Sequence, residues 1–117
     1  MAAISRVVLS GTPASGRVIP IAAIGTPGTL IHTAHATALD AVYLWASNVT
    51  RSAATLTIEW GGVLDPGDQI CRELVIRANS APLPILMGQT ITGGLIVRAF
   101  SGTANALNVS GFVTRIT

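Results

Sequence analysis

Two histidines form the most suggestive chemical pattern in the sequence. His32 and His35 make an H-x-x-H pair in the segment LIHTAHAT. Positions three apart on a strand face opposite sides, so this pair cannot chelate one metal ion without a bend in the chain. No cysteine or acidic residue stands at ligand spacing to complete a site. We therefore predict no metal site, and we interpret His32 as a strand residue that is hydrogen-bonded or half exposed.

The acidic residues offer no evident catalytic pair. Asp65 and Asp68 lie in the segment DPGD, where Asp-Pro-Gly is typical of a turn. A calcium ion would need about six to eight oxygen ligands, and this loop provides few others. Glu59 and Glu73 are predicted to face solvent from strands and to pair with arginines on neighbouring strands.

The single cysteine, Cys71, stands beside Arg72, whose charge could lower the pKa of the thiol. No nucleophile signature surrounds it, and the chain contains no phosphate-binding loop or dinucleotide motif. Free cysteine usually behaves as a small buried hydrophobic residue. The sequence therefore predicts no catalytic residues, no cofactor and no bound metal, and the protein is not expected to be an enzyme.

The charge composition is unusual for a small domain. Only 10% of the 117 residues are charged, and the seven basic residues are all arginines, against an average charged fraction of about 25%. Arginine is enriched and lysine depleted at protein interfaces, although a compositional bias of the source genome would give the same pattern. The net charge of +2 is small and the arginines are scattered, so we expect no nucleic-acid partner.

Hydropathy is high, but the apolar runs are short. The stretch VIPIAAIG at 18–25 is interrupted by Pro20, whereas a spanning helix needs about 20 apolar residues. Residues 1–15 contain an apolar patch that is too short for a secretory signal. We therefore expect no membrane partner, and we expect synthesis and folding in the cytoplasm.

Turn residues divide the chain at intervals near ten residues, and the segments between them are rich in Val, Ile, Leu and Thr. The one segment that could be helical, 35–46, ends in Val-Tyr-Leu-Trp, which favours a strand. The pattern predicts an all-β, single-domain, jelly-roll-like β-sandwich of about eight antiparallel strands over 16–117. Residues 1–15 are either an extended arm that reaches a neighbouring subunit or an ordinary first strand.

The alternation of side chains along the predicted strands indicates which residues form the core. It also shows more large apolar side chains than one core needs. Gly111 is predicted to mark a β-bulge. The expected core includes Leu44, Leu56, Ile58, Trp60, Val97 and Val109. Large side chains also occupy the strand positions that face away from this core. A contiguous exposed apolar patch usually marks an interface. The predicted interface residues are Arg6, Tyr43, Trp45, Ile96, Arg98 and Phe100.

Several strand segments carry a family resemblance. The order GTPGTLIHTA, LDAVYLWASNVTRSAATLTIEWGG and GLIVRAFSGTANALNVSGFVTRIT resembles small virion proteins of tailed bacteriophages and gene transfer agents. The resemblance covers about residues 25–117 and is least distinctive over 63–90. It implies a structural β-sandwich on the capsid surface, most simply a decoration (cement) protein on the lattice of the major capsid protein. Decoration proteins of this kind are usually trimers, so the expected partners are further copies of the chain and the capsid protein or another virion protein.

Two other functions remain open at this stage. A receptor- or carbohydrate-binding spike or fibre domain would need exposed aromatic residues, but the aromatic residues here lie within predicted strands. A head–tail connector or tail component would share the fold but occur in about six or twelve copies rather than hundreds. The copy number in the particle would separate these alternatives.

Overall fold

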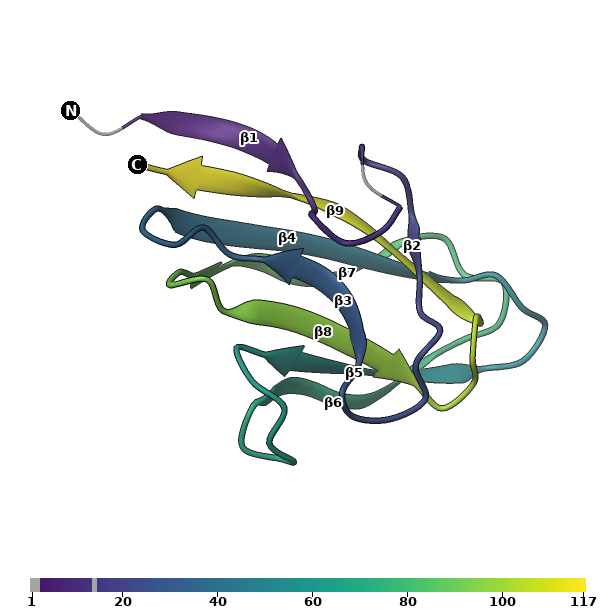
Figure 1. Ribbon diagram of the computed structural model, residues 1–117. Coiled ribbons are helices and arrows are strands. Elements are labelled where there is room, and N and C mark those ends of the chain that lie inside the picture. Colours follow the sequence, from purple (N-terminus) through teal and green to yellow (C-terminus); the bar gives the residue numbers. More distant parts are fainter. Residues whose placement is uncertain (1–2, 14) are drawn as a thin grey trace.

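The computed structural model describes residues 3–13 and 15–117, which fold into two antiparallel sheets packed face to face (Figure 1). Sheet A has the order β1-β9-β4-β7, with the short β2 also paired to β9. Its strands are β1 (Ile4–Val8), β2 (Ile19–Pro20), β4 (Leu39–Asn48), β7 (Leu83–Ile91) and β9 (Leu107–Ile116). Sheet B has the order β3-β8-β5-β6. Its strands are β3 (Thr29–Thr33), β5 (Ala54–Trp60), β6 (Gln69–Ile76) and β8 (Ile96–Ser101).

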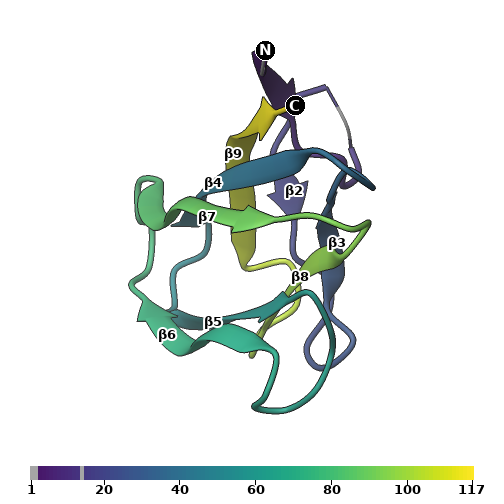
Figure 2. The same cartoon turned by 90° about the vertical axis from the view of Figure 1, so that its left-hand side faces the viewer.

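The topology confirms the predicted all-β sandwich, with nine strands rather than about eight. Apart from β2, the strands form nested antiparallel pairs: β5 with β6, β4 with β7, β3 with β8 and β1 with β9. Successive pairs alternate between the sheets, and the pairings of β4 with β9 and of β5 with β8 complete each sheet. A ribbon of paired strands rolled in this way is a jelly roll. Figure 2 shows β4 and β7 above β5 and β6, as the two layers require.

Strand alternation places the core as predicted. On β4, the side chains of Val42, Leu44 and Ala46 are buried, whereas Tyr43 and Trp45 face outward and stay partly exposed. Five of the six predicted core residues are at most 1% exposed, namely Leu44, Leu56, Ile58, Val97 and Val109. The sixth, Trp60, packs against this core from its margin and remains partly exposed.

The prediction of a bulge at Gly111 is wrong. The pairing of β9 with β4 runs without a register shift through this position, where Gly111 lies opposite Leu44. A Cβ atom at Gly111 would lie 2.0 Å from the carbonyl oxygen of Tyr43, and φ is +154°. Glycine is therefore required by the close approach of the β4 backbone, which a sequence pattern cannot distinguish from a bulge.

The N-terminal segment lies within the molecule's own sheet. Ile4–Val8 pairs with Phe112–Ile116 over five residues, and β1 and β9 lie side by side in Figure 1. This is the ordinary first strand of the two alternatives that the sequence left open. No helix among the described residues is long and apolar enough to cross a membrane.

Candidate functional site

The six predicted interface residues occupy two opposite surfaces of the sandwich. Arg6, Tyr43 and Trp45 lie at outward positions of sheet A, on β1 and β4. Ile96, Arg98 and Phe100 lie at outward positions of β8, in sheet B. A single partner surface therefore cannot cover all six, and the two faces must be considered separately.

The sheet A residues meet in one aromatic cluster. The Tyr43 and Phe112 rings stack with centroids 4.9 Å apart and an interplanar angle of 16°. The Trp45 ring lies 5.9 Å from the Phe112 ring, and the Arg6 guanidinium carbon sits 4.4 Å from the centroid of the same ring. Phe112 is thus the centre of the cluster, although it was not among the predicted interface residues. Its outward parity between the buried Val109 and Val113 could have identified it.

Exposed aliphatic side chains surround this cluster. Ile4 is 72% exposed, Met87 48%, Val8 46% and Leu39 39%. The register places these side chains on the same side of the sheet as the aromatic rings. We call this surface the A face, and it consists of Ile4, Arg6, Val8, Leu39, Tyr43, Trp45, Met87, Phe112 and Ile116. Four of its apolar side chains, Ile4, Val8, Leu39 and Met87, are more than a third exposed, and the largest exposed apolar patch of a monomer is often functional.

The A face carries one charge. Among the outward positions of the paired strands that the structure describes in sheet A, Arg6 is the only charged residue. The other outward positions hold apolar residues or neutral polar ones such as Ser110 and Thr114. The face therefore offers a large apolar surface with a single uncompensated cation.

The outer face of sheet B is partly covered by the chain itself. Glu59 was predicted to face solvent, and this prediction is wrong: its side chain is fully buried. The Gly28 N–H donates to Glu59 Oε1 at 2.6 Å, and the Thr26 hydroxyl donates to Oε2. Glu59 lies opposite Arg98 on β8, and Arg98 donates to the Gly28 carbonyl at 3.4 Å. The segment 26–28 thus anchors itself over sheet B, and less of this face is free for a partner.

A buried polar network closes one end of the sandwich. Asp40 on β4 accepts hydrogen bonds from Arg115 Nε at 2.8 Å and Arg115 Nη2 at 3.0 Å. Its Oδ2 lies 2.8 Å from His32 Nε2, and the His35 backbone N–H donates to the same oxygen at 3.2 Å. The His32 and Asp40 side chains are at most 1% exposed. Because β3 belongs to sheet B and β4 and β9 to sheet A, this network ties the two sheets together.

The hydrogen bonds set the charge state of the network. Burial alone would raise the pKa of Asp40, but the hydrogen bonds from Arg115, His32 and the His35 backbone, together with the charge of Arg115, lower this pKa to about 2. The same carboxylate raises the pKa of Arg115. Asp40 and Arg115 are therefore a charged pair at neutral pH.

A serine continues this network, which gives it the composition of a catalytic relay. Ser10 Oγ lies 3.2 Å from His32 Nδ1, and serine, histidine and aspartate in series can activate a nucleophile. Here, however, Nδ1 also accepts the Ser10 backbone N–H at 3.2 Å, and Ser10 Oγ accepts the Thr33 N–H at 2.7 Å. Asp40 is bound to Arg115 as well. These hydrogen bonds hold the loop after β1 against β3. The network is therefore better explained as a structural contact than as a nucleophile site.

The other residues that could do chemistry have local structural roles. His35 Nδ1 accepts the backbone N–H groups of Thr37 and Ala38, at 3.0 and 2.9 Å, within its own turn. Cys71 is half-buried, and burial raises the pKa of its thiol. Asp65 and Arg72 form an exposed ion pair at 2.7 Å. Within 3–13 and 15–117, no three His, Cys, Asp or Glu side chains are grouped to hold a metal ion.

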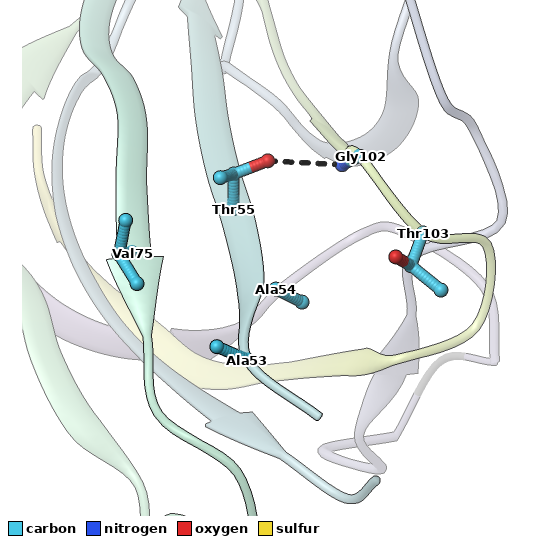
Figure 3. A pocket seen from close by; sticks show the side chains of 6 residues that line it. All are labelled: Ala53, Ala54, Thr55, Val75, Gly102 and Thr103. Carbon is cyan, nitrogen blue, oxygen red and sulfur yellow. Dashed lines mark hydrogen bonds between the residues drawn. The ribbon is translucent and has the colours of Figure 1, made fainter. Parts of the chain in front are cut away.

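Two of the surface hollows are lined by few reactive groups. The hollow in Figure 3 has a volume of about 340 Å³ and is lined by Ala53, Ala54, Thr55, Val75, Gly102 and Thr103. Thr55 Oγ1 accepts the Gly102 N–H at 3.1 Å there, and no titratable side chain lines it. A second hollow, of about 430 Å³, contains one carboxylate, Asp68, beside Trp60. Asp68 Oδ2 already accepts the Leu64 N–H at 3.0 Å.

The A face is therefore the best-supported candidate for function on this molecule.

Compared with known proteins, the chain matches no family model, no curated protein and no solved structure.

Proposed function

We propose that this protein is a virion structural protein, a capsid decoration (cement) protein that binds and stabilises the lattice of the major capsid protein as a homo-oligomer. The observation that carries the proposal is the A face, where aromatic and aliphatic side chains lie on the outside of a complete sandwich. Such a surface is typical of an interface. The proposal assigns this interface to a virion because the strand segments resemble those of small virion proteins.

The fold is compatible with this proposal without deciding it. Jelly rolls serve as viral capsid domains and also as lectins, and one fold supports many functions. What favours an assembly role is that the A face spans four strands of sheet A, from Ile4 on β1 to Met87 on β7. A broad sheet surface suits a protein partner better than a small molecule, which usually binds in a concave pocket.

The oligomer is expected to be a trimer, because the resemblance is to decoration proteins, which are usually trimers. A closed ring of subunits can also cover an extra apolar face on each copy. Light scattering on the isolated protein measures this directly. A stable monomer that also fails to bind expanded capsids would overturn the decoration proposal.

The experiment that tests the function is the copy number and position of the protein on the purified parent particle. A decoration protein is present in hundreds of copies spread over the capsid lattice. About six or twelve copies at one vertex would instead identify a head–tail connector or tail component.

The aromatic cluster also favours a second candidate, a receptor- or carbohydrate-binding domain. Tyr43, Trp45 and Phe112 form a partly exposed aromatic surface beside Arg6, and sugars stack on such surfaces. Titration with a panel of glycans, followed by isothermal titration calorimetry, tests this candidate. Saturable binding of one glycan, lost in Trp45→Ala, would favour it over the decoration proposal.

A further inference from the structure

Apart from the two-residue β2, which pairs only with β9, each sheet has two edge strands, and three of these four edges are protected. The β7 edge has two register shifts and a glycine, Gly88, at φ +100°. The β6 edge has two register shifts and a positive φ at Glu73. The β3 edge has a register shift, and the Gly11 N–H donates to the Ile31 carbonyl there. Bulges and covering loops are the usual means of preventing an edge from pairing.

Among residues 3–13 and 15–117, the β1 edge shows neither a register shift nor a backbone hydrogen bond from a covering loop. Its pairing with β9 is regular over all five residues. Ala3 and Thr117 exchange both backbone hydrogen bonds, at 3.1 and 2.9 Å. Hydrogen-bonded and non-hydrogen-bonded pairs alternate in an antiparallel ladder, so Ile4, Arg6 and Val8 direct their backbone groups away from β9. Within the described part of the chain, no hydrogen bond to these backbone groups is found.

The same three residues carry their side chains onto the A face. Ile4 and Val8 are exposed apolar residues on either side of Arg6. The Arg6 guanidinium is stacked over Phe112, which leaves its N–H groups at the edge of the plane available to an anion. At alternate positions, an added strand would therefore lie opposite apolar Ile4, cationic Arg6 and apolar Val8.

We propose that the β1 edge accepts an extended segment of another protein, which adds a strand to sheet A and places a carboxylate beside Arg6. Two residues before and after that carboxylate, the segment carries apolar side chains that meet Ile4 and Val8. Strand addition of this kind takes its affinity from backbone hydrogen bonds and its specificity from alternate side chains. The inference rests on the proposed function only in assigning this partner to the virion.

Charge argues against a second copy of β1 as the added strand. The A face contains no carboxylate. Antiparallel pairing of two β1 strands about their centre would set Arg6 directly opposite Arg6, and like charges in that position are destabilising. The observations therefore favour an acidic segment from a different chain.

The test uses two peptides, Thr-Leu-Thr-Glu-Thr-Leu-Thr and the same peptide with a central lysine. Each is titrated into the isotope-labelled protein and into Arg6→Glu, and backbone amide shifts are recorded by NMR. We expect the glutamate peptide to shift the amides of Ile4, Arg6 and Val8. The lysine peptide should bind the wild-type protein about fivefold or more weakly, and Arg6→Glu should reverse this preference.

Three outcomes would overturn the inference. Equal binding of both peptides would remove the role of Arg6. Shifts confined to β6 or β7 would place the binding edge elsewhere. No shift at millimolar peptide would mean that Arg6 protects the β1 edge from pairing, which is a common use of an edge charge. None of these outcomes concerns the copy number on the particle, so failure here is distinguishable from failure of the proposed function.

Discussion

Replacing Asp40 with asparagine should make the protein less stable at neutral pH and less sensitive to acid. Asp40 is fully buried, and its pKa is lowered from 3.8 to about 2. A carboxyl group with a lowered folded-state pKa contributes stability above its unfolded pKa, and that stability is lost as the pH falls through the folded value. The difference corresponds to about 2.5 kcal/mol of unfolding free energy, lost between about pH 5 and pH 1.

The assay is urea unfolding at pH 7, 4.5, 3 and 2, observed through tryptophan fluorescence. At pH 7, Asp40→Asn should lose about 3 kcal/mol, because Arg115 and His32 are left without their shared anion. The wild-type protein should then lose about 2 kcal/mol more than the variant on acidification to pH 2, where Asp40 is half protonated in the folded state.

The matched control is Asp65→Asn, which removes an exposed ion pair with Arg72. It should change stability by less than about 1 kcal/mol and should keep the wild-type pH profile. The reasoning is refuted if Asp40→Asn unfolds with the wild-type profile, or if its stability at pH 7 lies within about 1 kcal/mol of the wild-type value.

Three other substitutions test the fold at single positions. Gly111→Ala should destabilise by about 3 kcal/mol, because its Cβ would meet the Tyr43 carbonyl; thermal unfolding with an unchanged midpoint would contradict the close approach. Glu59→Gln should cost about 1–3 kcal/mol by weakening the bond from the Gly28 N–H, and faster exchange of the Gly28 amide would accompany it. Cys71→Ser should change stability by about 1 kcal/mol or less, and the wild-type thiol should react slowly with a disulfide reagent at pH 8, because burial raises its pKa; fast reaction would show that this burial is wrong.

The fold was predictable because the alternation of apolar and polar side chains along a strand can be seen within a short stretch of sequence. Val42, Leu44 and Ala46 share a parity that the structure buries, and the Gly- and Pro-rich turns divide the chain near the observed strand ends. The jelly-roll strand order follows less directly from the sequence, since it depends on which strands pair with one another over long separations in the chain. The short β2 was not expected as a separate strand, because two residues carry no periodic pattern.

The errors concern contacts between residues far apart in the chain. Glu59 has the outward parity of a solvent-facing residue, but the segment 26–28 folds over it, and nothing near Glu59 in the sequence indicates this cover. The prediction that His32 is a hydrogen-bonded strand residue is confirmed, but its partner Asp40, on the other sheet, was not identified. Asp40 shares the inward positions of β4 with Val42, which indicates a buried carboxyl group but does not identify its partner.

The candidate site was predicted in part. Arg6, Tyr43 and Trp45 were expected to lie at an interface, and the structure brings them together around Phe112. Ile96 and its neighbours on β8 have the same kind of sequence pattern but belong to the opposite sheet. Membership of a sheet is set by tertiary topology, so strand parity alone could not separate the two groups.

The central claim, that the A face binds the virion, is tested most directly by rebinding two variants to particles from which the protein has been released. Ile4→Ser changes a residue of the A face that is 72% exposed, and Val75→Ser changes a residue on the outer side of sheet B that is 67% exposed. Both sites lie on edge strands in solvent, so neither change should affect folding. We predict that Ile4→Ser weakens particle binding about tenfold, through lost apolar burial, whereas Val75→Ser binds like the wild-type protein. Unchanged binding of Ile4→Ser together with weakened binding of Val75→Ser would contradict the account.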